Sequence, residues 1–310
     1  MADARTDLLG KRPLGPTGLE VTGICVGAAP LGSMPADYGE VGAEQGIAVA
    51  RRALAGPFNF LDTANNYGDG RSERRIGVAL RDAGGVPDGF VLATKVDRDA
   101  SGDFSGARVR RSLEESFHRL GISRAQLVYL HDPEHISFAE GVASGGPVEA
   151  LVALRDEGLI EHLGVAGGPI DLLLEYLDTG VFEVVLTHNR FTLVDRTADP
   201  LLDAAAARGL AAVNGAPFGG GVLAKGPEAR PTYAYEPLTT EARRRIAALA
   251  ATCDRHDVGV AAVALQHSLR DPRIASTVVG VSGPERIDEL DRLARVPVPA
   301  ELWEALEAEG

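Results

Sequence analysis

Short apolar runs recur along the chain, each bounded by Gly, Pro or Asn and separated by stretches of mixed polarity. The runs are rich in Val and Leu and do not alternate strictly between apolar and polar residues, which is typical of strands buried on both faces. We expect eight such strands, in residues 23–32, 59–63, 89–95, 125–132, 160–167, 182–189, 209–217 and 274–281.

Amphipathic helices are expected between most of these strands. In residues 106–120, apolar side chains at helical spacing form one face, made of Val109, Leu113, Phe117 and Leu120. Pro147 stands where the first turn of a helix tolerates proline, and Gly158 stands where a helix ends. Such alternation of strands and helices predicts a parallel sheet with right-handed crossovers.

Eight strand–helix units in about 260 residues favour a closed (β/α)8 barrel, the TIM barrel, within the α/β class. An open doubly wound sheet is the alternative, but the chain lacks the GxGxxG and Walker fingerprints of such sheets. Residues 11–21 predict a β-hairpin before the first barrel strand. No linker divides the chain, so we expect residues 1–310 to form one domain. The Gly- and Pro-rich residues 215–237 predict a long functional loop at the C-terminal face.

Polar side chains end three consecutive strands, at Asp62, Lys95 and His131, and Tyr67 follows the first strand. Taken singly, each has a plain structural interpretation. The aspartate could form a turn, the lysine could be a solvated strand tip, the histidine could cap, and the tyrosine could pack. Because the active sites of barrels are built at the C-terminal ends of their strands, the four side chains together predict one site.

The chemistry of these four groups suits proton transfer at a carbonyl or an alcohol. A free phenol ionises only near pH 10, and a nearby ammonium lowers its pKa. We expect Lys95 to act in this way on the phenol, Asp62 to pair with the lysine, and His131 to hydrogen-bond a substrate oxygen. A cofactor would carry the hydride in such a reaction.

Composition narrows the classes of partner. The 310 residues include 31 basic and 44 acidic side chains, so the formal net charge is −13 at pH 7. This balance argues against nucleic acid and membrane partners, which need clustered Lys and Arg. The two cysteines, Cys25 and Cys253, cannot build a disulfide framework, and no apolar run approaches 18 residues. We expect a cytoplasmic protein that acts on a small-molecule substrate, with its oligomeric state open.

A metal site at His131 and His135 is an alternative interpretation, because their spacing can place two ligands on one helix face. Pro133 lies between them in a segment that leaves a strand, so a helix is not expected there. We therefore predict no metal. Cys25 ends an apolar run and is interpreted as a core residue.

Residues 62–68, DTANNYG, resemble the Asp-Thr-Ala-x-x-Tyr-Gly segment of the aldo-keto reductases. LATK (92–95) and LVYLHD (127–132) resemble the strands that carry the lysine and histidine of that family, and the similarity extends over nearly the whole chain. The resemblance implies a (β/α)8 barrel with an extended nicotinamide cofactor across its mouth. It also implies a catalytic tetrad, in which the tyrosine is the general acid or base: Asp62, Tyr67, Lys95 and His131.

Residues 188–196 and 214–223 are similar to one subgroup of the family. It contains the L-fucose and D-threo-aldose 1-dehydrogenases, the L-galactose dehydrogenases and the pyridoxal 4-dehydrogenases. The NAD-dependent members of this subgroup oxidise a hemiacetal carbon to a lactone. The resemblance implies cofactor contacts at His188, Asn189, Gly215, Pro217, Gly219, Gly221, Gly280, Ser282 and Arg286.

The resemblance also indicates which nicotinamide cofactor is preferred. Where NADP-using relatives carry a Lys-Ser pair and an Asn, this chain has Gly280, Val281 and Leu290, and only Arg286 of the phosphate clamp remains. A 2′-phosphate is held best by charge-assisted hydrogen bonds from Arg and Lys. We therefore expect NAD to be preferred and NADP to be accepted weakly.

Two other functions stay open. An NADPH-dependent reductase of aldehydes or ketones would use the same four residues. The chain also resembles the β subunits of voltage-gated potassium channels, so a nucleotide-binding redox sensor without turnover is the alternative of another class.

Overall fold

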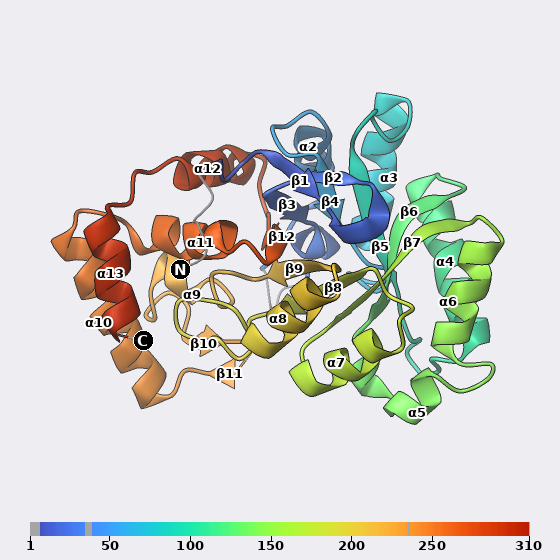
Figure 1. Ribbon diagram of the computed structural model, residues 1–310. Coiled ribbons are helices and arrows are strands. Elements are labelled where there is room, and N and C mark those ends of the chain that lie inside the picture. Colours follow the sequence, from blue (N-terminus) through green and yellow to red (C-terminus); the bar gives the residue numbers. More distant parts are fainter. Residues whose placement is uncertain (1–6, 35–38, 235, 310) are drawn as a thin grey trace.

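Eight parallel strands close into a barrel in a computed structural model that describes residues 7–34, 39–234 and 236–309 (Figure 1). In ring order the strands are β12 (Ile274–Gly280), β3 (Ile24–Gly27), β4 (Phe60–Asp62), β5 (Val91–Val96), β6 (Ala125–His131), β7 (Ile160–Gly167), β8 (Val184–His188) and β9 (Ala211–Gly215). All eight predicted strands are confirmed, and the closed ring replaces the open sheet that was the alternative. The expectation of one domain over 1–310 stays a prediction, and its ends, residues 1–6 and 310, lie outside the described residues.

Helices surround the barrel (Figure 1). They are α2 (Ala43–Leu54), α3 (Arg71–Ala83), α4 (Gly106–Leu120), α6 (Pro147–Asp156), α7 (Ile170–Asp178), α8 (Asp199–Ala207), α11 (Val260–Arg270) and α12 (Glu285–Ala294). The bounds of α4 are those of the predicted amphipathic stretch. Its N-cap Ser105 accepts a hydrogen bond from the Arg108 amide, and Gly121 ends it in the left-handed conformation. Pro147 is the first residue of α6, as its position in the sequence indicated.

Both faces of the barrel strands are buried, which explains why the strand sequences do not alternate. Side chains inside the ring, such as those of Phe60, Ala93 and Leu127, form one cluster, whereas neighbouring residues such as Leu61 and Val128 pack against the helices. Cys25 belongs to the interior cluster and is fully buried, so its prediction as a core residue is confirmed.

A hairpin closes the N-terminal end of the ring. Its strands β1 (Lys11–Pro13) and β2 (Glu20–Thr22) pair antiparallel, and the turn between them contains η1 (Gly15–Thr17). Leu14 and Val21 from this hairpin are fully buried in the interior cluster. The predicted hairpin is therefore confirmed, and the opposite end of the barrel is the one left for a site.

The described part of the long segment 215–237 includes regular secondary structure. It contains α9 (Val222–Lys225) and the small hairpin of β10 (Thr232–Tyr233) and β11 (Glu236–Pro237); residue 235 lies outside the described residues. The Tyr233 hydroxyl donates to the Asn189 carbonyl oxygen at 2.9 Å and lies 2.9 Å from the Thr192 hydroxyl. These contacts fasten the segment to the chain that leaves β8.

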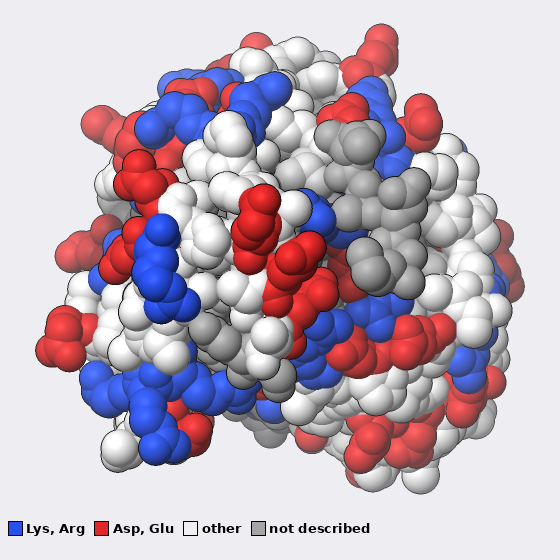
Figure 2. All heavy atoms as spheres, turned by 60° about the vertical axis from the view of Figure 1, so that its left-hand side comes forward, with Lys and Arg blue, Asp and Glu red and all other residues white. Residues whose placement is uncertain are grey.

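The described residues also form α5 (Phe138–Gly141), α10 (Thr240–Arg255) and α13 (Ala300–Glu309). Helices α10 and α13 pack together on one side of the barrel (Figure 1). Acidic and basic side chains are interspersed over the face that Figure 2 shows. Among the described residues, no helix has the length and apolar character needed to cross a bilayer.

Gly68 allows the loop after β4 to approach η2 (Ala29–Gly32) closely. Its φ of 59° is left-handed, and a Cβ atom there would lie 1.9 Å from the Gly32 carbonyl oxygen. The same oxygen accepts a hydrogen bond from Arg71 Nε at 2.8 Å. This contact fixes the loop that carries Tyr67.

We expect Gly68→Ala to destabilise the protein by about 2–4 kcal/mol, because left-handed strain adds to a clash with the backbone. Gly84→Ala is the matched control, since Gly84 has a φ of 81° but no atom within 4 Å of its Cβ position. The control should cost only the conformational strain of about 1–2 kcal/mol. Urea unfolding measures both losses, and equal losses would contradict the role of the close approach.

Candidate active site

The four predicted tetrad residues meet at the C-terminal end of the barrel. Asp62 ends β4, Lys95 lies near the end of β5, His131 ends β6, and Tyr67 lies in the turn before α3. All four line one cavity of about 480 Å³. The sheet register explains the convergence, because β4, β5 and β6 are consecutive neighbours whose carboxyl ends point the same way.

The Lys95 ammonium is the centre of this cluster. Nζ lies 2.5 Å from Asp62 Oδ1, 2.7 Å from the Thr63 carbonyl oxygen and 3.1 Å from the Tyr67 hydroxyl oxygen. These three contacts match the three donors of an ammonium, and the lysine side chain is only 1% exposed. The lysine is therefore held in one position, where its charge stabilises negative charge on the phenol oxygen. Burial raises the pKa of Asp62, and the ammonium opposes that rise.

His131 is held by a carboxylate that the sequence reasoning did not single out. Its Nδ1 lies 2.7 Å from Asp97 Oδ1, and its ring meets the Tyr67 ring edge-on with centroids 5.6 Å apart. A carboxylate only accepts hydrogen bonds, so Nδ1 carries the proton and Nε2 is the remaining ring nitrogen. Burial lowers the pKa of His131, but the carboxylates of Asp97 and Asp132 outweigh it and the net shift is upward.

The signal that could have revealed Asp97 is its spacing from Lys95. Side chains two residues apart along a strand point to the same side, and Asp97 directly follows β5. Asp97 therefore turns toward the mouth of the barrel, as Lys95 does.

Further polar groups line the same cavity, namely Asn66, Asp132 and His188. The backbone of Asp132 is left-handed, with φ 44°, as the chain turns sharply out of β6. Although burial opposes it, the neighbouring histidines and Lys95 lower the pKa of Asp132. Burial lowers the pKa of His188. The cavity thus offers a carboxylate, an amide and a neutral imidazole to a polar ligand.

A smaller hollow of about 130 Å³ adjoins the cavity, because Ala216 and Gly280 line both. The cofactor contacts expected from the sequence divide between the two. His188, Gly215 and Gly280 line the cavity, whereas the hollow is lined by Pro217, Gly221, Gly280, Ser282 and Arg286.

Asn189 and Gly219 are the two expected cofactor contacts that do not line these walls. The Asn189 side chain is buried, and its Nδ2 lies 3.2 Å from His188 Nδ1. A Cβ atom on Gly219 would lie 2.3 Å from the Tyr233 ring. Asn189 therefore contacts His188, and Gly219 lies against Tyr233, and neither residue lines the cavity or the hollow.

The combined groove fits an extended, anionic nicotinamide dinucleotide. Lys225, Arg230 and Arg286 line the hollow, and no Asp or Glu is among its described lining residues. Gly27, Gly215 and Gly280 line the cavity without side chains, and a Cβ atom on Gly27 would lie 2.9 Å from Val278. Lys225 and Arg230 were not expected from the sequence, because nothing in their spacing marks the turn that brings them beside Arg286.

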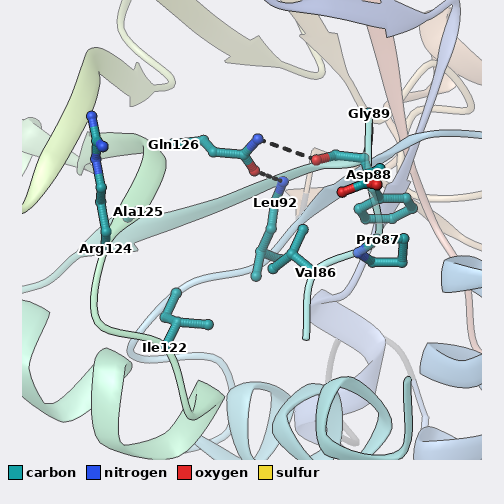
Figure 3. Close-up of a pocket in the computed structure, with 10 residues that line it drawn as sticks. Val86, Pro87, Asp88, Gly89, Leu92, Ile122, Arg124, Ala125 and Gln126 are labelled. Carbon is teal, nitrogen blue, oxygen red and sulfur yellow. Dashed lines mark hydrogen bonds between the residues drawn. The ribbon is translucent and has the colours of Figure 1, made fainter. Parts of the chain in front are cut away.

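Another pocket lies at the opposite end of the barrel (Figure 3). Its walls come from the N-terminal ends of β5 and β6 and include Val86, Asp88 and Ile122. Gln126 is the central polar residue there, but its amide bridges the Leu92 N–H at 3.0 Å and the Phe90 carbonyl at 3.2 Å. The pocket therefore has a structural amide and no set of groups for proton transfer.

No metal centre emerges from the described residues, since none of their His, Cys, Asp and Glu side chains form a group of three or more that could hold an ion. His135 lies in the short η3 (Pro133–His135), not on a continuous helix with His131.

Comparisons with known proteins agree with this fold. The family model for the aldo/keto reductase family matches residues 23–309. The chain is 32% identical to L-galactose dehydrogenase of Arabidopsis thaliana, over 90% of this chain and 86% of that protein. It is 30% identical to pyridoxal 4-dehydrogenase of Microbacterium luteolum, over 97% of each. The solved holo form of aldo-keto reductase AKR11C1 from Bacillus halodurans shares the fold, with a TM-score of 0.77, 22% identity and coverage of 97% of this chain and 96% of that one.

The family match spans the strands that carry the cluster and the segments that form the groove. The family uses nicotinamide cofactors, and the groove fits one. The chain therefore belongs to the aldo/keto reductase family and is an NAD(P)-dependent oxidoreductase.

Proposed function

We propose that the protein uses NAD to oxidise the hemiacetal carbon of an aldose, or of pyridoxal, to a lactone in the cytoplasm. The observation that carries the proposal is the Lys95 ammonium, which contacts both Asp62 and Tyr67 on one side of a cavity that His131 also lines. The names of the relatives support the substrate class, because they act on L-galactose and on pyridoxal.

The protein supplies the proton chemistry of this reaction. Tyr67 is the base: its phenol oxygen takes the proton of the substrate hydroxyl, while Lys95 stabilises the charge on that oxygen. Asp62 fixes the ammonium, and His131 hydrogen-bonds the substrate oxygen through Nε2. A nicotinamide cofactor held in the groove would supply the two-electron acceptor for the hydride of the C–H bond that breaks. The remaining C–O bond becomes the carbonyl of the lactone.

The lining residues would hold both ligands. Lys225, Arg230 and Arg286 would pair with the phosphates of the dinucleotide. Asn66, Asp132 and His188 would hydrogen-bond the hydroxyl groups of the substrate. A site that buries polar groups discriminates against a substrate that cannot pair with them, which favours a hydroxyl-rich sugar over an apolar aldehyde.

The preference for NAD is supported by the state of Arg286. Its guanidinium forms an ion pair with Glu289 of the same helix, so part of its charge is already compensated. Gly280 and Val281 offer neither a cation nor a hydroxyl where NADP-using relatives have a Lys-Ser pair. Lys225 and Arg230 also line this hollow, so a weak capacity for NADP is retained.

The first test measures NAD-linked oxidation by the parent protein and by Tyr67→Phe, a variant that lacks only the phenol oxygen. With NAD, the protein should oxidise at least one of L-fucose, L-galactose, D-arabinose and pyridoxal, and Tyr67→Phe should lower kcat by about 10²–10⁴-fold. The reason is that the substituted ring keeps its packing but loses the group that takes the proton.

Tyr176→Phe is the matched control, because Tyr176 is a buried tyrosine of α7 outside the site, and it should keep the activity of the parent. If Tyr67→Phe kept more than about a tenth of the parental rate with chemistry limiting, the role of Tyr67 would be wrong. Tight nucleotide binding with no oxidation or reduction of any substrate would instead favour the redox sensor.

The second test uses Lys95→Met, which removes the ammonium next to the phenol oxygen. The variant should be strongly impaired at neutral pH, and its oxidation rate should recover as the pH is raised, because hydroxide then forms the phenolate without help. Steady-state rates across the alkaline range measure this. Lys11→Met, at an exposed lysine of the hairpin, should follow the parental profile. A flat profile for Lys95→Met would contradict the electrostatic role.

The third test compares affinities for the two oxidised cofactors. Without the lysine contact, a binding free energy of about 1.5–3 kcal/mol is lost, which is roughly a tenfold to 150-fold loss in NADP affinity, so NADP should bind more weakly than NAD. Isothermal titration calorimetry is the suitable method, because the single tryptophan, Trp303, packs against Arg270 and not in the groove. Arg286→Met should weaken NADP more than NAD. An equal or lower Kd for NADP would contradict the preference and favour the NADPH-dependent reductase.

A further inference from the structure

Asp97 is a buried carboxylate that touches two parts of the site at once. Its Oδ1 pairs with His131 Nδ1 at 2.7 Å, and its Oδ2 accepts the Asn66 N–H at 3.0 Å. Asn66 immediately precedes Tyr67. One carboxylate therefore holds both the imidazole and the backbone of the loop that carries the phenol.

The backbone of Asp97 is itself anchored from α4. Its N–H donates to the Ser112 hydroxyl at 3.0 Å, and its carbonyl oxygen accepts from Arg108 Nε at 3.0 Å. The residue is only 2% exposed. Its carboxylate is thus preorganised, and little conformational freedom has to be lost when it orients the imidazole.

We propose that Asp97 is a positioning residue, which fixes the protonated Nδ1 of His131, aims Nε2 at the substrate oxygen, and stabilises the imidazolium when Nε2 also holds a proton. The inference rests on the proposed function, in which His131 contacts the substrate. Asp97 itself touches neither substrate nor cofactor in this arrangement and acts through the histidine. The closest chemical parallel is a carboxylate that sets the tautomer of a catalytic imidazole.

The charges around His131 support this role. Carboxylates face it from the end of β5, from the turn after β6 and from β4, at Asp97, Asp132 and Asp62. The opposing groups are the Lys95 ammonium and the His188 imidazole, and the neutral Tyr67 ring packs edge-on. Asp97 is the closest carboxylate, since Asp132 Oδ1 is 3.7 Å from Nε2. Because the net pKa shift of His131 is upward, removal of the Asp97 charge should lower that pKa.

Asp97→Asn is the central variant. Its amide oxygen can still accept the Asn66 N–H, so the loop keeps its anchor, whereas its NH₂ group donates to Nδ1 and favours the wrong tautomer. We expect kcat to fall about 10–100-fold, as for other carboxylates that orient a histidine, with the Kd for NAD unchanged. Asp99→Asn is the control. Asp99 is a half-buried carboxylate of the same loop that accepts hydrogen bonds from Ser101 and from the Asp103 N–H, and this variant should keep parental turnover.

A double-mutant cycle separates positioning from a general effect on folding. If Asp97 acts through His131, then Asp97→Asn should have no further effect on kcat in a His131→Asn background. If the two substitutions lowered kcat independently, by factors that multiply, the proposal would be overturned.

Nitrogen-15 NMR of labelled histidine tests the contact without turnover, with His131→Asn used to assign the signal. In the parent, neutral His131 should carry its proton on Nδ1, and its titration midpoint should fall by roughly one unit or more in Asp97→Asn. An Nε2–H tautomer in the parent, or equal midpoints, would overturn the proposal even if the variant folded poorly. Absence of sugar and pyridoxal oxidation by the parent would refute the proposed function alone, since the NMR result does not depend on it.

Discussion

Burial of the Lys95 ammonium is the constraint on which the site depends. An ammonium taken from water loses several kcal/mol of solvation, which only close acceptors can return. Asp62 Oδ1, the Thr63 carbonyl and the Tyr67 hydroxyl are those acceptors, and all three belong to the strand and loop of the preceding barrel unit. The contacts that stabilise the buried ammonium of Lys95 therefore also fix the position of the Tyr67 phenol. A site assembled in this way is rigid without any dedicated clamp.

The loop between β4 and α3 is held in place by further contacts outside the barrel ring. Its Asn65 backbone donates to the Lys95 carbonyl at 3.2 Å, and its carbonyl accepts from Arg119 at 2.9 Å. Arg119 also pairs with the fully buried Glu73, whose other oxygen accepts from the Thr94 hydroxyl at 2.7 Å. An unpaired buried charge is costly, so loss of any one of these contacts would destabilise the group that it leaves without a partner. The charges behind the barrel wall thus hold Tyr67 at its distance from Lys95.

The sequence predicted most of the fold and the centre of the site, because both depend on short-range patterns. Buried strands have uninterrupted apolar runs, and barrel topology then places Asp62, Lys95 and His131 together. The spacing of Asp97 from Lys95 indicates only that its side chain turns toward the mouth of the barrel, and its role depends on a contact with His131 of β6 that this spacing does not identify. Lys225 and Arg230 were missed for a similar reason, since a long segment brings them to the groove through tertiary contacts such as that of Tyr233 with Asn189.

The polar residues of the mouth divide into two groups by what they face. Behind the reacting oxygen, Lys95 and Asp97 present opposite charges to Tyr67 and His131, one stabilising a phenolate and the other an imidazolium. Tyr67 and His131 line the same cavity, and in the proposed reaction both would face the same substrate oxygen. A proton that leaves the substrate therefore enters a field arranged before binding, and little reorganisation is needed during the reaction. In the proposed reaction, Asp132 and His188, which line the same cavity, would pair with substrate hydroxyls and so select the substrate rather than move the proton.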